Sequence, residues 1–326
     1  VCLLEDGFGG RVLFVSADIF GFGPELVTAV QNEAAIWGIE PDAVVLNASH
    51  THYAPGTITH GVPGLGVFEQ GFATQVFTAI ANALPRLYQD LDTAEISWGR
   101  AEAQIGFNRR KCVNGQIEMV PNPDAHYEVE TPILSVRRGD GQRLLMVNHG
   151  CHPTGLGAST VISADYPGAM RDGILRRDGA DVVMFLQGAA GNIKQGAQVG
   201  DQTGWIGRQE DVDQLGDRLA QAVMTAMETL TPIVGPLQYN RQTVHLPLKD
   251  AIATSASPVD GDIPQPILDA WATVVDRHHP GGAEHVELAI TSVALGEAAF
   301  VNIPGEPMAE TAQRLRTLSN RHDVLF

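Results

Sequence analysis

Short apolar runs rich in β-branched residues recur along the chain, and longer stretches of mixed polarity separate them. The runs are Val12–Val15, Val44–Leu46, Ile133–Val136, Leu144–Val147, Val182–Leu186 and Ala298–Ile303. Continuous apolar runs of this length are typical of strands that are buried on both faces. They predict a β-sheet at the centre of the fold.

Helical spacing fills several of the intervals between these strands. Apolar positions recur every three or four residues in Phe68–Leu84, Val212–Ala226 and Met308–Leu315, and Pro307 suits the first turn of the last helix. Strands that alternate with helices predict an α/β fold. The runs 133–136 and 144–147 are joined by a short "RRGDGQ" connection that indicates a hairpin. We therefore expect a mixed β-sheet core flanked by helices.

Turn residues mark the connections. The segment "VCLLEDGFGGRVLFVSAD" predicts a strand, a turn and a second strand. The pieces "GFGPEL" and "GAAGNIKQG" lack the glycine spacing of a phosphate-binding loop, and we interpret both as tight turns. The largely polar stretch 247–266 is interpreted as a surface loop.

Four of the apolar runs end in residues that can carry chemistry. The endings are "NASHTH" with His50 and His52, "NHGCHPT" with His149 and His152, "QGAAGNIK" with Asn192, and "PGEPM" with Glu306. Ligands of α/β sheets bind beyond the carboxyl ends of strands, so these endings are expected to meet in one cleft. Two histidines and a carboxylate form a donor set used by catalytic zinc.

Each ending also has a plainer interpretation. Histidines in loops are usually ordinary polar residues, Asp165 in "ISADYPG" is suited to cap the following helix, and Glu306 is favourable at a helix N-terminus. Recurrence after successive strands favours the shared site. His278, His279, His285 and His322 have no such context, and we interpret them as surface residues.

Charge and composition narrow the classes of function. The chain has 326 residues and a formal net charge of −17, which argues against nucleic-acid partners and against docking on anionic lipid. Its three cysteines are too few and too scattered for a disulfide framework, and no apolar run is long enough for an integral membrane segment. Both ends are expected to be cuts through a larger domain, and the compartment is left open.

Taken in order, "NASHTHYAPG", "FNRR", "NHGCHPT" with "ISADYPG", "FLQGAAGN" and "VNIPGEPM" resemble the neutral/alkaline non-lysosomal ceramidase family in its N-terminal catalytic domain. The likeness is nearer to shorter bacterial members whose substrates are mostly unassigned. It covers nearly the whole chain, so residues 1–326 are expected to form a single ceramidase-like catalytic domain, incomplete at both termini.

The resemblance implies a zinc site and its chemistry. The family binds one Zn²⁺ through two histidines, a glutamate and a tyrosine, which implies His50, His152 (rather than His149) and Glu306 as ligands here. It implies that Arg109 reaches the substrate carbonyl. It also places His52 beside the metal, where His52 or Asp165 would transfer a proton.

The sequence departs from the family pattern at three points. No tyrosine follows "PGE" before the chain ends at Phe326, so the fourth ligand is expected beyond that residue. Lys194 and Asn192 occupy the positions where ceramidases have serine and aspartate, and this difference argues against ceramide as the substrate. The family's N-terminal portion and C-terminal immunoglobulin-like domain are also missing.

The prediction is a zinc-dependent hydrolase that cleaves an amide (N-acyl) bond by attack of a metal-activated water. The expected substrate is a small-molecule acyl-amide or a lipid-like compound. Two alternatives stay open: a zinc-dependent esterase or lactonase on the same scaffold, and a non-catalytic metal-binding or ligand-binding protein.

Overall fold

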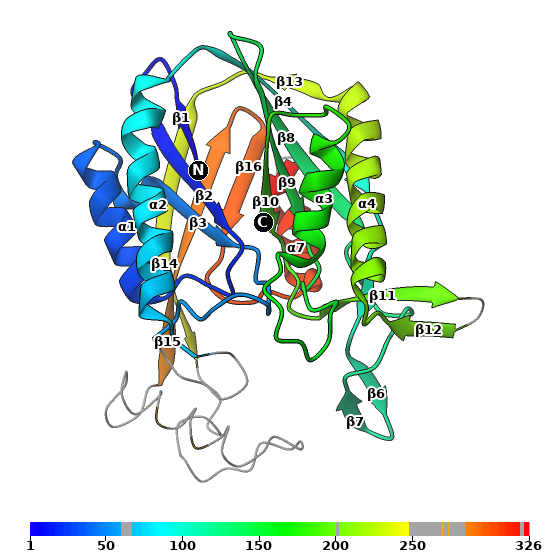
Figure 1. The fold of residues 1–326 in the computed structure, drawn as a ribbon. Coiled ribbons are helices and arrows are strands. Elements are labelled where there is room, and N and C mark those ends of the chain that lie inside the picture. The colour runs from blue at the N-terminus through cyan, green and yellow to red at the C-terminus, as the bar shows by residue number, and fades with distance from the viewer. Residues whose placement is uncertain are drawn as a thin grey trace.

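A three-stranded sheet forms the N-terminal part of the computed structural model, which describes residues 1–59, 67–199, 202–247, 284–319 and 323–325 together with Asp269 and Thr273 (Figure 1). Strand β2 (Arg11–Ala17) lies between β1 (Cys2–Glu5), which is antiparallel to it, and β3 (Val44–Ala48), which is parallel to it. Helices α1 (Pro24–Ile36) and α2 (Gln70–Gln89) pack against each other beside this sheet (Figure 1).

The central sheet has five strands in the order β10-β9-β8-β4-β13. They are β10 (Val182–Gln187), β9 (Arg143–His149), β8 (Glu130–Arg138), β4 (Ala94–Glu102) and β13 (Thr231–Ile233). Only the β10–β9 pair is parallel, so the sheet is mixed, as predicted. Helices α3 (Asp165–Leu175) and α4 (Gln209–Ala226) pack together and cover one face (Figure 1). Their close approach depends on Gly216, because a Cβ atom there would lie 2.4 Å from the Cβ of Ala169.

Smaller sheets complete the fold. One contains β12 (Gln202–Trp205), β11 (Ile193–Val199) and β5 (Gly106–Asn108), and another contains β14 (Leu237–Pro247), β15 (His285–Leu295), β16 (Ala298–Asn302) and β17 (Asp323–Leu325). Strands β6 (Lys111–Val113) and β7 (Gln116–Glu118) form a hairpin. The remaining described elements are the short 3₁₀ helices η1 (Pro41–Ala43) and η2 (Met227–Thr229) and the helix α7 (Ala309–Leu318).

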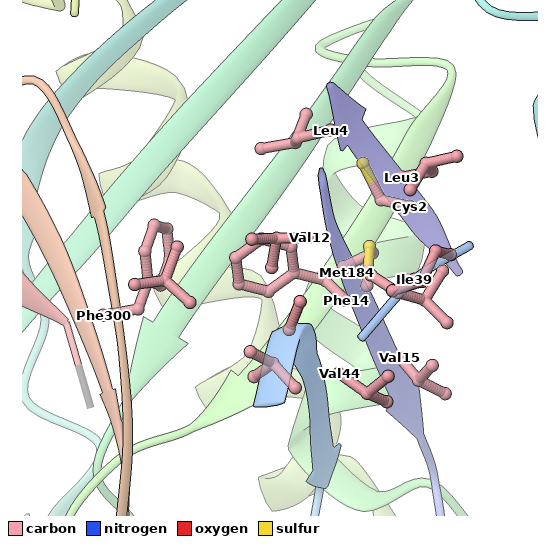
Figure 2. Close-up of a cluster of buried hydrophobic side chains, with 14 of the residues drawn as sticks. Cys2, Leu3, Leu4, Val12, Phe14, Val15, Ile39, Val44, Met184 and Phe300 are labelled. Carbon is pink, nitrogen blue, oxygen red and sulfur yellow. The ribbon is translucent and has the colours of Figure 1, made fainter. Parts of the chain in front are cut away.

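Two hydrophobic cores hold these layers together. The first lies around β2, and Figure 2 shows Phe14 of β2 beside Phe300 of β16, with ring centroids 5.0 Å apart. The second lies between the central sheet and helices α3 and α4, around the fully buried Tyr166 and Phe185. Burial of such large apolar side chains is the main source of folding free energy.

A side-chain amide joins the N-terminal sheet to the central one. Asn47 of β3 donates its Nδ2 to the carbonyl of Gln187 in β10 at 3.2 Å, and its Oδ1 accepts the backbone N–H of Gln187 at 2.7 Å. Ser16 of β2 adds a bond from its hydroxyl to the carbonyl of Phe185 at 2.5 Å. These bonds bring the carboxyl ends of β3, β9 and β10 to one edge of the fold, where the loops carrying polar residues meet.

The α/β class, the predicted hairpin β8–β9, and helices α2, α4 and α7 are confirmed. The interpretation of "GFGPEL" and "GAAGNIKQG" as tight turns is wrong at the end of each piece, because α1 begins at Pro24 and β11 begins at Ile193. Pro307 lies before α7, whose N-cap is Met308. The predicted loop 247–266 falls beyond Pro247 outside the described residues, as do His278, His279 and His322. None of the helices in the described ranges combines the length and the hydropathy that a bilayer span needs.

Candidate metal centre

His50 has a strained backbone conformation, and its ring points into the space beyond the strand ends. Just after β3, His50 donates its backbone N–H to the carbonyl of Ile19 at 3.0 Å and adopts a φ of 63°, which non-glycine residues seldom do. Its ring Nδ1 lies 2.9 Å from the carbonyl oxygen of Phe20. A carbonyl can only accept, so Nδ1 carries the proton and Nε2 presents a lone pair. The backbone at His50 is therefore not extended, although the rings of His50 and His52 face the same space, with centroids 5.2 Å apart.

His152 is held in the same way in the loop after β9, a strand of the central sheet. Its backbone N–H donates to the carbonyl of Ile193 at 3.1 Å, and its Nδ1 lies 2.7 Å from the carbonyl of Ala190. The side chain is 2% exposed. Backbone carbonyls thus fix the tautomer of both histidines and leave both Nε2 atoms free to ligate.

His149, three residues earlier, lies apart from this arrangement. It ends β9 as a buried residue, with Nδ1 2.9 Å from the hydroxyl of Thr131. Burial lowers the pKa of His149 to about 4, so the ring is neutral. The structure thus places the ring of His152, and not that of His149, in contact with His50 and Glu306.

Glu306 closes the cluster from a third segment, the loop after β16. Its Oε1 lies 3.4 Å from Nε2 of His50 and its Oε2 lies 3.1 Å from Nε2 of His152. NH2 of Arg109 lies 4.0 Å from Oε2 of Glu306, and this positive charge favours the ionised carboxylate at neutral pH.

Tight backbone contact between two loops sets the position of Glu306. Gly191 donates its N–H to the carbonyl of Pro307 at 2.9 Å. A Cβ atom at Gly191 would lie only 2.4 Å from the carbonyl oxygen of Glu306. Only glycine permits this approach, so the loop after β10 fixes the position of the loop that carries Glu306 by direct backbone contact.

Asn192 strengthens the same contact by capping α7. Its Oδ1 accepts the N–H of Ala309 at 3.0 Å and its Nδ2 donates to Oε2 of Glu310 at 2.8 Å. Asn192 thus anchors the helix that follows Glu306.

The converging atoms form a donor set in need of a cation. Nε2 of His50 is buried and has no hydrogen-bond partner in the described part of the chain. Burial and then the neighbouring His152 lower the pKa of His50, which favours the neutral ring. Each of the two imidazole lone pairs lies within 3.4 Å of an oxygen of the Glu306 carboxylate, and these groups repel one another unless something positive lies between them. A metal ion satisfies all three donors at once, so the residues fit Zn²⁺.

His52 stands at the exposed rim of the cluster. The ligating nitrogens of His50, His52 and His152 all lie within 4.8 Å of one another. Partial desolvation by the surrounding wall, and then the charges of His50 and His152, lower the pKa of His52 to about 4. A neutral imidazole therefore faces the candidate metal position with a lone pair available.

Arg109 approaches the cluster from the other side. Its NH2 donates to the carbonyl of Gly191 at 2.8 Å, and the same atom lies 3.4 Å from Nε2 of His152 and 4.0 Å from Oε2 of Glu306. A guanidinium only donates, so this geometry agrees with a lone pair on Nε2 of His152. It also sets a fixed positive charge beside the candidate metal position.

Asp165 is not brought into direct contact with the His/Glu cluster. The buried carboxylate accepts the N–H of Gly155 at 2.9 Å and that of Tyr166 at 2.6 Å, and its own φ is 56°. Burial raises the pKa of Asp165, and the two backbone bonds partly oppose this effect. Its contacts shape the loop between His152 and α3.

A cavity of about 400 Å³ opens directly beside the cluster. His50, His152 and Glu306 form part of its wall, and the apolar side chains of Phe22, Leu46, Ile58, Val301 and Ile303 form another part. A substrate with an apolar portion can therefore lie against the candidate metal position.

Sequence reasoning identified these side chains but missed the backbone that aims them. The carbonyls of Phe20 and Ala190 fix the two histidines, and Gly191 admits Glu306. The run of small residues in "QGAAGN" was the available signal, because such runs permit close backbone approach.

The fold has counterparts among solved structures. One is described as the neutral ceramidase from Pseudomonas aeruginosa, with a TM-score of 0.74 and 16% identity over 99% of this chain and 60% of that chain. Another, a ceramidase complexed with C2, has the same score and identity over 99% of this chain and 61% of the other. The chain thus spans about 60% of the length of these proteins. No family model and no curated protein sequence matches it. Over nearly its whole length, this chain has a fold similar to that of neutral ceramidase.

Proposed function

We propose that this protein is a zinc-dependent hydrolase that cleaves an amide (N-acyl) bond, with Zn²⁺ held by His50, His152 and Glu306. The observation that carries the proposal is the convergence of two imidazole Nε2 atoms on one carboxylate, at 3.4 and 3.1 Å. This donor set is used by catalytic zinc, which keeps a further position open. Zinc bound there would act as a Lewis acid and lower the pKa of a water molecule toward neutrality.

The surrounding side chains supply the rest of the reaction. The oxygen of water bonds to the carbonyl carbon, the carbon–nitrogen bond breaks, and a carboxylic acid and an amine are released. Arg109 donates to the carbonyl oxygen as negative charge develops on it. The fixed position of its guanidinium, bonded to Gly191, means that little reorganisation is needed during the reaction.

We assign proton transfer to His52. It is neutral at neutral pH and lies at the open rim of the cluster, where it can accept a proton from water and return it to the leaving nitrogen. Asp165, the other candidate from the sequence, already accepts two backbone N–H bonds away from the cluster. It is better suited to hold the loop.

The ceramidase likeness favours an amide over an ester or lactone, whose carbonyl would meet the same groups. It also favours a lipid-like acyl-amide, which agrees with the apolar wall of the neighbouring cavity. Arg109 beside the metal position favours catalysis over metal binding alone, because a guanidinium close to zinc ligands serves a substrate oxygen.

The test compares two histidines that are three residues apart. We expect about one zinc per chain in the intact protein, as for a single mononuclear site. His152→Ala should abolish tight binding, whereas His149→Ala should retain most of it. Chelation should remove hydrolysis of acyl-amides, and added zinc should restore it. Equal loss of zinc from both variants, or from neither, would refute the ligand assignment.

A further inference from the structure

A second cation stands on the same side of the site as Arg109. The strand register pairs Phe107 of β5 with Lys194 of β11, and Arg109, two residues beyond Phe107, donates its N–H to Asn192 at 2.8 Å. Side chains two residues apart on a strand point to the same side, so Arg109 and Lys194 project from one face. An isolated bridge joins the backbone of Lys194 to that of His152, which places this face next to the candidate metal position.

Lys194 has no carboxylate partner among the described residues. Its Nζ instead lies 5.5 Å from the ring centroid of Trp205, a cation–π contact that holds the half-buried side chain in place. Burial and then the charge of Arg109 lower the pKa of Lys194. An unpaired, partly desolvated ammonium is unfavourable in the absence of an anion, and it stands out in a chain with 38 acidic and 21 basic residues.

The two sides of the candidate site therefore differ in character. The cavity lies on the side of β3 and β16, and neither Arg109 nor Lys194 is part of its wall. Arg241 does line it, but this guanidinium is paired with Asp42 at 3.4 Å. Arg109 and the unpaired Lys194 lie on the side of β5 and β11. An amide held across the metal position would thus have an apolar half in the cavity and its other half beside a positive charge.

Resting on the proposed function, we infer that the substrate carries an anionic group on the amine side of the scissile bond and that Lys194 binds this group. The substrate class is an N-acyl amino acid or an N-acyl amine that bears a phosphate. An ammonium has only donors to offer and recognises either anion as a point charge. Trp205 positions the ammonium, and the acyl chain occupies the apolar cavity.

The test uses three conjugates that share one acyl chain: N-octanoylglycine, N-octanoylphosphoethanolamine and the neutral N-octanoylglycinamide. Binding to the zinc-loaded protein is followed by stopped-flow tryptophan fluorescence before turnover, at low ionic strength. At least one anionic conjugate should bind roughly tenfold more tightly than the neutral one, as one charged hydrogen bond would give. A preference for the glycine or for the phosphate conjugate decides between the two anions.

Lys194→Met keeps an apolar side chain on Trp205 and removes the charge. The ratio of the affinity for the anionic conjugate to that for the neutral conjugate should then fall to about one, and Lys194→Arg should restore most of this preference. Lys111→Met, which removes the same charge from an exposed position on β6, should leave the preference unchanged. The inference would be overturned if the intact protein bound all three conjugates equally or bound none of them. It would also be overturned if Lys194→Met kept the preference for the anionic conjugate.

The outcome is separable from the proposed function. Zinc content and hydrolysis of the neutral conjugate test the hydrolase itself, and neither depends on Lys194. A protein that binds zinc and hydrolyses the three conjugates equally well would keep the proposed function and lose this inference. A protein that binds an anionic conjugate preferentially but hydrolyses none would lose the proposed function and keep only an anion-binding role for Lys194.

Discussion

Two groups of side chains in the described residues could hold a metal ion, and they differ in how they are built. The first is His50, His52 and His152, with Glu306 in contact with two of them. His50, His152 and Glu306 come from separate loops, and backbone carbonyls fix both imidazoles. The second cluster, His245, His285 and Glu287, consists of neighbours on the β14–β15 hairpin. Its three side chains are 48–65% exposed, whereas His50 and His152 are 13% and 2% exposed and Glu306 is 48% exposed.

The contrast shows that proximity of ligand types does not define a site. In the hairpin cluster, His245 Nδ1 lies 3.6 Å and His285 Nε2 3.9 Å from the same oxygen of Glu287, and no backbone bond to either ring is observed in the described residues. Exposed pairs of this kind interact weakly because water competes and the side chains lose rotamer freedom. In the loop cluster the donors are already oriented, so little ordering remains to oppose metal binding.

The largest effect on zinc affinity should come from neutralising Glu306, the carboxylate of the loop cluster. Glu306→Gln should weaken zinc binding by more than ~100-fold, since even an outer partner of a ligand accounts for roughly 10- to 100-fold. The matched change Glu287→Gln in the hairpin should leave zinc affinity unchanged, as measured by competition with a chromophoric chelator. A larger loss from Glu287→Gln would reverse the comparison.

Removing the fixed charge beside the cluster should affect turnover and leave the metal in place. Arg109→Gln should lower kcat for an acyl-amide by roughly 100- to 1000-fold, the usual effect of losing an oxyanion donor. Zinc content should stay at the wild-type value. Arg110→Gln, which changes the exposed neighbouring arginine, serves as the control and should keep kcat within about twofold. Loss of zinc together with kcat in Arg109→Gln would instead indicate a structural role.

The preorganisation of Glu306 can be disturbed without touching a ligand. Gly191→Ala should displace the Glu306 loop, because the new Cβ would lie 2.4 Å from the Glu306 carbonyl oxygen, and zinc affinity should fall by roughly 10- to 100-fold. Gly204 has open space within 4 Å of the corresponding position, so Gly204→Ala should bind zinc like the wild type. Calorimetric titration with zinc measures the affinity of both variants. Equal zinc affinities of Gly191→Ala and Gly204→Ala would show that the loop contact is dispensable.

A smaller effect is expected on the pH dependence of folding stability, and it should differ between buried and exposed histidines. The pKa of His149 is about 4 in the fold against an ordinary value of 6.5, so the unfolded chain takes up the proton first as pH falls. The stability gained by keeping His149 neutral is complete above pH 6.5 and is lost toward pH 4, by at most about 3 kcal/mol. Urea unfolding of His149→Gln should show a shallower decline across this window than the wild type. His285→Gln, at an exposed position, should follow the wild-type slope.

The sequence predicted the parts of the fold that depend on periodicity. The long apolar stripes of α2 and α4 and the buried runs of β2, β9 and β10 were visible because each repeats over many residues. The long hairpin strands β14 and β15 were not identified, because most of their side chains are exposed or half-buried and the hydrophobic signal is weak.

For the candidate site, residue types and their positions after strands were readable, whereas orientation was not. Nothing in "NASHTH" indicates that His50 adopts a φ of 63° or that the Phe20 carbonyl fixes its ring. Likewise, the separation of Asp165 from the cluster follows from backbone bonds to Gly155 and Tyr166 that form only in the folded chain. Such details depend on tertiary contacts between loops far apart in sequence.

The most direct test of the central claim is a crystal structure of the protein soaked with one equivalent of zinc, with anomalous data collected on both sides of the zinc absorption edge. We predict a single strong anomalous peak about 2.0–2.2 Å from Nε2 of His50, Nε2 of His152 and a carboxylate oxygen of Glu306. The β14–β15 hairpin should show no peak of comparable height. A peak confined to His245, His285 and Glu287, or no peak between the three loops at full zinc occupancy in solution, would contradict the account.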